Sequence, residues 1–262
     1  MLNNVLAIAQ KELQGNLSSP SMYAITACFW FFSGFFFVQI LISDRGIIQQ
    51  VLYREQTSSA VIAVDVATEF LNSYLAVLGT LSLLFVPLLS MGLYAEEKKL
   101  GTMELLATSP ITNWAVASGK LISVTLFFIF LLLPSFFLEA IAFSAARPPL
   151  PPLVPLLAHL GLILMVTALL SIGMFISSLT NSNVLAAVLT FATILVFWTL
   201  DLIASNTETW LADGLEHISL LESYNNLVRG VFAISDLILL LSYIFLGLFL
   251  TSQSVNLFRC HR

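Results

Sequence analysis

Residues 95–111 read AEEKKLGTMELLATSPI, a charged segment between two long apolar runs. Gly101 permits a sharp turn of the backbone, Thr102 can cap a new helix, and Pro110 ends it. Glu104 lies in the first turn, where a carboxylate complements the positive end of the helix dipole. The segment also holds apolar residues that need a partner surface: Met103, Leu105, Leu106 and Ile111. This pattern predicts a short helix outside the bilayer, either docked on a partner protein or lying on lipid headgroups.

The composition indicates an integral membrane protein. The 262 residues are 58% hydrophobic and 10% charged, whereas about a quarter of the residues in soluble domains are charged. The net charge of -5 comes from acids placed around the apolar runs, and there is no basic patch. A nucleic-acid partner is therefore not expected.

Six apolar runs are long enough to cross a hydrocarbon core of about 30 Å. We expect spans at 22–42, 70–94, 121–138, 160–179, 184–200 and 237–258, with kinks at Pro87 and Pro134. None has an ionisable residue in its middle, which argues against an ion-coupled carrier. Glu139, just after the third span, is expected to be an exposed carboxylate at the membrane interface. The predicted fold class is an all-α membrane protein with six transmembrane helices, forming a single transmembrane domain over residues 1–262.

Three segments outside the spans have their own character. Residues 1–20 predict an interfacial helix with Val5, Leu6, Ala9 and Leu13 near one face and Glu12 on another. Residues 96–113 form the charged segment that contains the predicted short helix. Residues 201–236 carry six acids and several apolar clusters, which predicts short amphipathic helices on the other side of the membrane: Asp201, Glu208, Asp213, Glu216, Glu222 and Asp236.

Charge placement predicts the orientation. An even number of spans puts both termini on one side, and that side would carry six of the ten basic residues: Lys11, Lys98, Lys99, Lys120, Arg259 and Arg262. By the positive-inside rule, both termini are expected in the cytoplasm, which suggests a multi-pass protein of the bacterial inner membrane.

The sequence lacks the residues that several kinds of binding site require. Gly119-Lys120 has neither the upstream glycine nor the following Ser or Thr of a phosphate-binding loop. The three histidines are scattered, with no metal-ligand spacing. We therefore expect no catalytic residues, no cofactor and no metal in this chain, so that the energy for active transport would come from a cytoplasmic partner.

The sequence resembles the transmembrane permeases of ABC type 2 transporters, and in particular those of the gliding-motility type. The likeness is carried by a motif that continues to Gly119-Lys120, with support from Lys11-Glu12-Leu13 near the start and Arg229-Gly230-Val231 before the last span. The residues of that motif are Glu96, Glu97, Gly101, Thr102, Met103, Glu104, Leu105, Leu106, Ser109, Pro110 and Ile111.

The resemblance implies a dimerising permease that couples ATP hydrolysis by separate cytoplasmic ATPase subunits to export of a substrate. ATP and Mg would be bound by those subunits, and the second permease copy would be identical or a paralogue. The motif residues would form the coupling helix that contacts the ATPase. One departure from the pattern is visible, since Gly92 stands where a basic residue would pair with Glu96.

Two readings from other classes stay open. A channel or membrane scaffold that needs no ATPase would use the charged segment for assembly, and would show no dependence on nucleotide. A lipid-modifying enzyme would need a convergent set of acid, base and nucleophile, which the sequence does not offer. The aromatic run of the first span is expected to pack or to face lipid: Phe29, Trp30, Phe31, Phe32, Phe35, Phe36 and Phe37.

Overall fold

The chain folds into a bundle of helices, with no strand among the residues described. The computed structural model describes residues 2–43, 46–57, 66–103, 111–144, 150–206, 219–231 and 233–260. The helices in chain order are α1 (Leu2–Ser18), α2 (Pro20–Ile42), α3 (Ile47–Thr57), α4 (Val66–Ser90), α5 (Gly92–Lys99), α7 (Asn113–Ser144), α8 (Leu153–Leu179), α9 (Asn183–Asn206), α11 (Leu220–Val228) and α12 (Ile234–Cys260).

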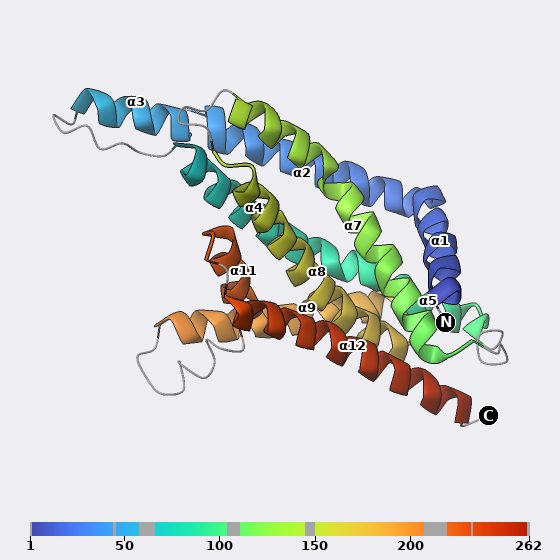
Figure 1. Ribbon diagram of the computed structural model, residues 1–262. Coiled ribbons are helices and arrows are strands. Elements are labelled where there is room, and N and C mark those ends of the chain that lie inside the picture. The colour runs from blue at the N-terminus through green and yellow to red at the C-terminus, as the bar shows by residue number, and fades with distance from the viewer. Residues whose placement is uncertain are drawn as a thin grey trace.

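Six stretches within the described residues are long and apolar enough to cross a membrane, which confirms the predicted fold class. They are Pro20–Gln50, Val66–Lys99, Asn113–Ser144, Leu153–Leu179, Asn183–Ile203 and Ile234–Phe258. The second of these combines α4 and α5, which are separated only by a break at Met91. The long helices run side by side, slanting across the bundle (Figure 1).

Helix α8 is the centre of the bundle. It packs against α4, α5, α7, α9, α11 and α12, and its buried residues include Ala168, Ser171, Gly173 and Ser177. Small side chains let neighbouring helices approach closely inside a membrane, where no hydrophobic force holds helices together. The Ser171 hydroxyl also bonds the carbonyl of Tyr243 on α12, at 3.2 Å. The small buried residues of α8 therefore explain why the other helices can pack closely around it.

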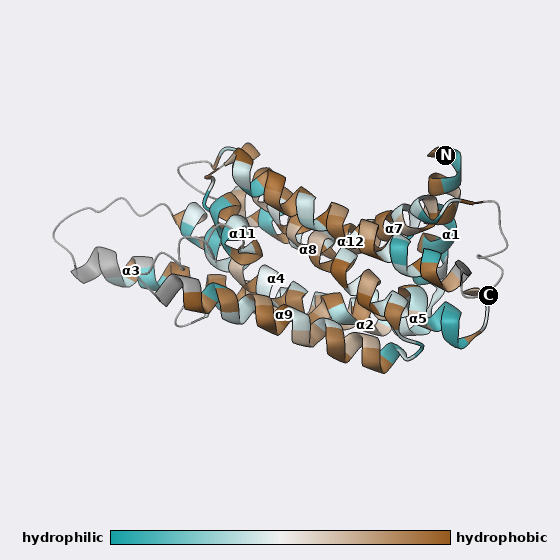
Figure 2. Cartoon of the chain, turned by 90° about the horizontal axis from the view of Figure 1, so that it is seen from below, coloured by the Kyte–Doolittle hydropathy of each residue, from teal (hydrophilic) through white to brown (hydrophobic). Residues whose placement is uncertain are grey.

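The bundle has two ends of different character. Helices α1 and α5 and both chain termini lie at one end, which we call the termini end, and α3 and α11 lie at the opposite end (Figure 1). Hydrophilic residues gather on α1, α5 and α11, while the long helices between them are mostly apolar (Figure 2). Polar residues are thus at both ends of an apolar band, as a membrane requires.

Helix α11 is tied into the opposite end by its own side chains. Its N-cap residue Ser219 accepts a hydrogen bond from the backbone of Glu222 at 3.1 Å. Burial, helped by the negative charge of Glu139, raises the pKa of the Tyr224 hydroxyl far above its ordinary value. The hydroxyl therefore stays protonated and donates to the carbonyl of Leu75 on α4. Within residues 201–236, where short amphipathic helices were predicted, the described residues include this one short helix, and its place on the far side of the membrane stays a prediction.

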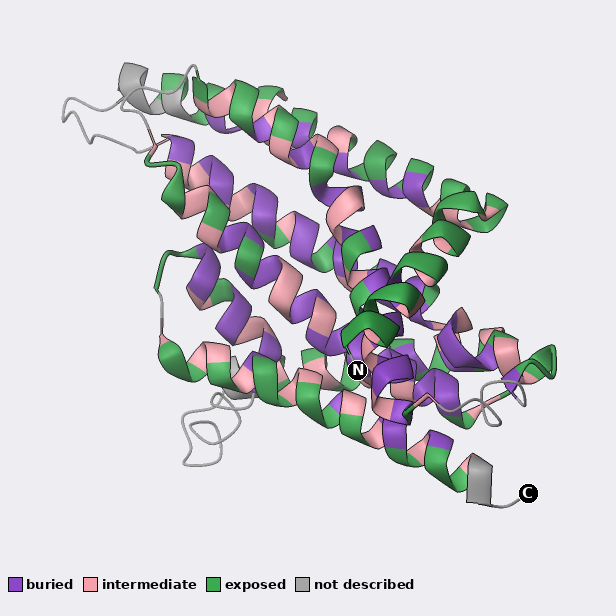
Figure 3. Cartoon of the chain, turned by 45° about the vertical axis from the view of Figure 1, so that its right-hand side comes forward, coloured by how far each residue is buried: buried purple, intermediate pink, exposed green. Residues whose placement is uncertain are grey.

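The outer helices carry many exposed residues (Figure 3), and many of these are large and apolar. Much of α2, α9 and α12 faces outward, including Phe35, Val188 and Phe245. In the aromatic run of α2, Phe29 is buried, whereas Phe31 is exposed. The run thus serves both packing and an outward apolar face, as predicted, and such a face suits lipid or a second membrane chain.

The helices are longer than the sequence analysis predicted, and this changes the place of several charged groups. The third span extends over Asn113–Ser144 instead of 121–138. It therefore includes both Lys120 and Glu139, which are 2% exposed. The prediction that Glu139 is an exposed interfacial carboxylate was wrong, because α7 continues past it and α8 begins early enough to cover it.

Candidate functional site

The break between α4 and α5 is held open by a serine from another helix. Ser177 of α8 accepts hydrogen bonds from the backbone N–H groups of Tyr94 and Ala95, at 3.1 and 3.0 Å, and donates to the Met91 carbonyl at 2.8 Å. Backbone groups that lose their helical partners at a break must find others when they are buried. One hydroxyl supplies three such bonds, so the direction of α5 is set by α8.

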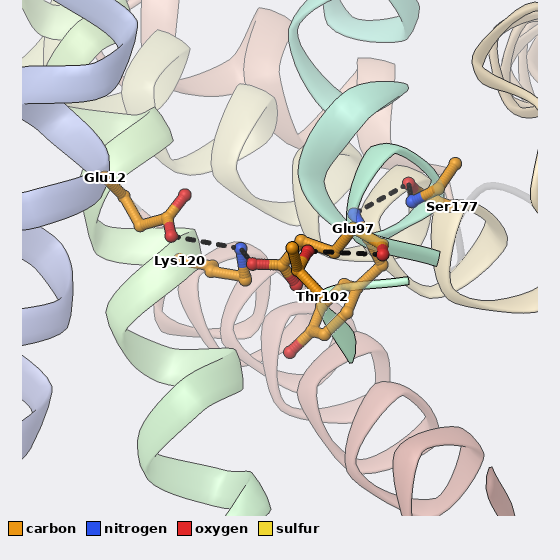
Figure 4. A network of polar contacts seen from close by, with 7 residues as sticks. Glu12, Glu97, Thr102, Lys120 and Ser177 are labelled. Carbon is orange, nitrogen blue, oxygen red and sulfur yellow. Dashed lines mark hydrogen bonds and ion pairs between the residues drawn. The ribbon is translucent and has the colours of Figure 1, made fainter. Parts of the chain in front are cut away.

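The opposite face of α5 is held by a buried lysine. Lys120 of α7 lies 2.9 Å from Glu97 of α5 and 3.2 Å from Glu12 of α1, measured from Nζ to Oε1 in each case (Figure 4). The lysine side chain is 3% exposed and the two carboxylates about a fifth exposed. Its Nζ also lies 5.3 Å from the centre of the Tyr94 ring, within the range of a cation–π contact. A single ammonium group thus joins three helices at the termini end.

Helix α1 lies directly on α7 beside this lysine. A Cβ at Gly119 would come within 2.7 Å of the Ile8 side chain and 3.0 Å of the Val5 carbonyl. Only glycine therefore permits this approach. The inward face of α1 comprises Val5, Ile8, Ala9, Glu12 and Leu13. Leu6, predicted on that face, is 57% exposed, and Glu12, predicted on another, points inward to Lys120.

A second lysine fixes α5 on its far side. The Lys98 ammonium donates to the carbonyl of Ser178 at the end of α8 and lies 5.3 Å from the ring of Phe258 on α12. Ser254 of α12 donates to the same Ser178 carbonyl at 3.3 Å. Helix α5 is thus clamped between α8 and α12 on one side and α7 and α1 on the other.

The chain turns sharply where α5 ends. Gly101 has a φ of +71°, in the left-handed region that favours glycine, as the sequence predicted. The Thr102 hydroxyl donates to the carbonyl of Glu97 at 3.3 Å. This hydrogen bond joins Thr102 to the preceding helix α5. Met103 is 2% exposed and belongs to the hydrophobic core, against which Ile111 also packs. Both ends of the predicted coupling segment are therefore anchored in the bundle.

The predicted coupling residues divide into two groups. The first group lies in the described part of the chain. In it Glu96 is exposed and Glu97 binds Lys120, and the other members are Gly101, Thr102, Met103 and Ile111. The remaining predicted residues lie outside the described part of the chain: Glu104, Leu105, Leu106, Ser109 and Pro110. The coupling helix and its contact with an ATPase therefore stay predictions.

Three residues of this site were not among the candidates: Glu12, Lys120 and Ser177. The sequence held a signal for Glu12 and Lys120 in the pair Gly119-Lys120. A glycine at the start of a span lets another helix cross closely, and the neighbouring lysine can then pair with an acidic residue on that helix. The expected loss of an ion-pair partner at Gly92 is offset by Lys120, which pairs with Glu97 instead of Glu96. Ser177 had no local signal, because its partners are about 80 residues away.

The described residues contain no group of three or more His, Cys, Asp or Glu side chains that could hold a metal ion. The polar contacts at the termini end join helices to one another instead of converging on a ligand. The arrangement suits the transmission of motion between the surface of the termini end and the spans.

Six helices able to cross a membrane, with a charged helix held at one end of the bundle, define a multi-pass membrane protein. The family model described as "ABC-2 family transporter protein" matches residues 6–258. The chain belongs to this family and is a transmembrane permease subunit of an ABC transporter, a component that is generally not itself catalytic. Members of the family associate with ABC ATPase subunits. A search of the curated proteins finds no match.

Proposed function

We propose that this chain is the permease of an ATP-driven exporter and converts the closing of partner ATPase subunits into movement of its spans. The observation that carries the proposal is the ion-pair cluster of Lys120 with Glu12 and Glu97. It links α5, which leads into residues 104–110, to α1 and to the start of α7. A force applied to the coupling segment would therefore reach three helices at once.

Two further features support this direction of coupling. Helix α5 continues α4 after only a short break, so a tilt of α5 passes into the second span. Ile111 packs on the core immediately before α7 begins, so the other end of the segment passes into the third span. Packed helices transmit displacement because interiors are dense and resist compression.

In this proposal the coupling residues are Glu96, Glu97, Gly101, Thr102, Met103, Glu104, Leu105, Leu106, Ser109, Pro110 and Ile111. ATP and Mg would be held by the ATPase, and a second permease copy or a paralogue would complete the transporter in the bacterial inner membrane, with both termini cytoplasmic. The exposed apolar faces of α2, α9 and α12 are available for that second copy or for lipid.

Co-purification with the ATPase tests the proposal. The double variant Leu105→Asp, Leu106→Asp is expected to release the ATPase while the permease still elutes as a folded membrane protein. Val231→Asp is the matched control, since Val231 is 55% exposed at the opposite end. Unchanged ATPase binding in the double variant would contradict the proposal, and substrate or ion flux through the permease alone, with no nucleotide dependence, would favour the channel reading.

A further inference from the structure

An open groove lies at the termini end of the bundle, where α5, α8 and α12 come together. Its volume is about 590 Å³. The wall residues are Lys98, Phe175, Ser178, Leu179, Leu250, Gln253, Ser254, Leu257 and Phe258. Among these described residues Lys98 alone carries a charge. The groove is therefore suited to an anion and offers no carboxylate to a cation.

The ammonium group of Lys98 lies in the wall of this groove. Both of its described contacts are wall residues, since it donates to the Ser178 carbonyl and its Nζ lies 5.3 Å from the centre of the Phe258 ring. The side chain is half-buried, and no described acidic side chain lies within ion-pair distance of it. An ammonium group has three N–H donors, so the Ser178 carbonyl leaves others for a ligand. A partly desolvated charge without a counter-charge is costly, and an anion in the groove would reduce that cost.

Two neutral polar side chains of α12 lie in the same wall. Ser254 donates to the Ser178 carbonyl at 3.3 Å, the same oxygen that Lys98 binds. Its hydroxyl oxygen can still accept a hydrogen bond. Gln253 is exposed, and its amide can both donate and accept. One ammonium group with a hydroxyl and an amide can bind a phosphate and hydroxyl groups attached to it.

The rest of the groove is apolar and follows the spans. Phe175 of α8 and Leu250 of α12 lie about one helical turn deeper in the bundle than the polar wall residues. Leu179 and Leu257 are 59% and 63% exposed, so the groove opens on an outer apolar surface. Polar groups near the end of the bundle and apolar walls further in match the order of headgroup and acyl chain in a lipid leaflet.

We propose that this groove binds a phospholipid whose headgroup carries a phosphate and no amine, such as phosphatidylglycerol. The phosphate would lie at Lys98 and supply its counter-charge, and an acyl chain would lie against Phe175 and Leu250. A headgroup with its own ammonium group would bring a second cation into a groove whose wall holds no carboxylate. The binding requires neither ATP nor the coupling segment and so does not depend on the proposed function.

Photolabelling can test this proposal. The full-length protein in phosphatidylcholine nanodiscs receives a trace of phosphatidylglycerol that carries a diazirine on one acyl chain, or of phosphatidylcholine with the same chain. Labelled peptides are mapped by mass spectrometry. We expect the phosphatidylglycerol probe to label the peptides that contain Phe175 and Leu250 about tenfold more than the phosphatidylcholine probe does, as a hydrogen bond between charged groups implies.

Three variants separate this site from general attraction to a basic surface. Lys98→Gln should remove the preference for phosphatidylglycerol, whereas Lys98→Arg keeps a charged donor and should retain most of it. Lys99→Gln is the matched control, because it removes the same charge from the next, exposed position of α5 and should label as the unaltered protein does. An equal loss in Lys98→Gln and Lys99→Gln would overturn the proposal.

Competition in the unaltered protein keeps the test decisive if Lys98→Gln does not fold. Unlabelled phosphatidylglycerol should suppress labelling in the groove, whereas inorganic phosphate should not, since it lacks the acyl chains. Suppression by inorganic phosphate would indicate a site for a free anion. Equal labelling by the two lipid probes would indicate an apolar surface without headgroup recognition, and either result would overturn the proposal.

Discussion

At the scale of single residues, Lys120 stabilises the packing of several helices, because its ammonium group faces two carboxylates from two other helices. Replacing it by methionine removes the positive charge and leaves Glu12 and Glu97 close to each other in a partly buried place. We expect Lys120→Met to lower the free energy of unfolding by about 2–4 kcal/mol, somewhat less than for a fully buried pair because both carboxylates keep some water. Thermal unfolding in detergent measures the loss.

Two further variants separate charge from packing. Lys99→Met removes an exposed lysine one turn from Glu96 and should change the melting temperature little. Adding Glu97→Gln to Lys120→Met removes one of the two stranded charges and should recover part of the loss. If Lys120→Met melts at the same temperature as the Lys99→Met protein, the ion-pair cluster does not hold the helices together.

Ser177 offers a prediction of a different kind, since its hydroxyl serves backbone groups. Ser177→Ala leaves the N–H groups of Tyr94 and Ala95 without their described acceptor, at a cost of about 1–3 kcal/mol. The result should be faster amide hydrogen exchange in α5, measured by mass spectrometry. Ser178→Ala is the control, because among the described residues that hydroxyl bonds within its own helix, to the carbonyl of Phe175. Equal exchange in the two variants would show that the break does not depend on Ser177.

At the scale of elements, the close contact between α1 and α7 depends on the missing side chain at Gly119. Gly119→Val should push α1 away from the bundle, since even a Cβ would meet Ile8 at 2.7 Å. Limited trypsin cleavage after Lys11 should become faster. Adding Ile8→Ala should restore part of the protection, but only part, because the Val5 carbonyl at 3.0 Å remains in the way.

The matched control for this variant lies on α1 itself. A Cβ at Gly15 would meet nothing within 4 Å, so Gly15→Val should leave the rate of trypsin cleavage near that of the unaltered protein. Slow cleavage in Gly119→Val would mean that α1 can stay docked by shifting along α7, and the glycine would then not be what sets the contact.

The same contacts show which features of the structure could be predicted from the sequence. Apolar length predicted all six spans, since the hydrocarbon core sets it, and the turn at Gly101 followed from local chemistry. The places of Glu12, Lys120 and Ser177 did not follow, because each depends on how helices distant in sequence cross. Glu139 was misplaced for a similar reason: its burial comes from α8, across residues 145–149, and no periodicity within α7 reveals it.

At the scale of the whole molecule, the arrangement of the ends constrains any mechanism. Both termini, α1 and α5 lie together at one end, so the same side of the membrane must hold the predicted coupling segment and both termini (Figure 1). The positive-inside rule predicts that this side is the cytoplasm. Orientation and function are therefore linked, because an ATPase can reach α5 only if the termini end is cytoplasmic.

Cysteine labelling in intact bacteria tests this orientation. In a background in which Cys28→Ser and Cys260→Ser remove the natural thiols, single cysteines are placed at Leu100 beside the coupling segment and at Val231 at the opposite end. These positions are 67% and 55% exposed. A membrane-impermeant maleimide should modify Val231→Cys in intact cells, and Leu100→Cys only after the inner membrane is permeabilised. The reverse pattern would place the coupling segment outside the cell, where no ATPase could bind it, and would exclude the proposed mechanism while leaving the six-helix fold unaffected.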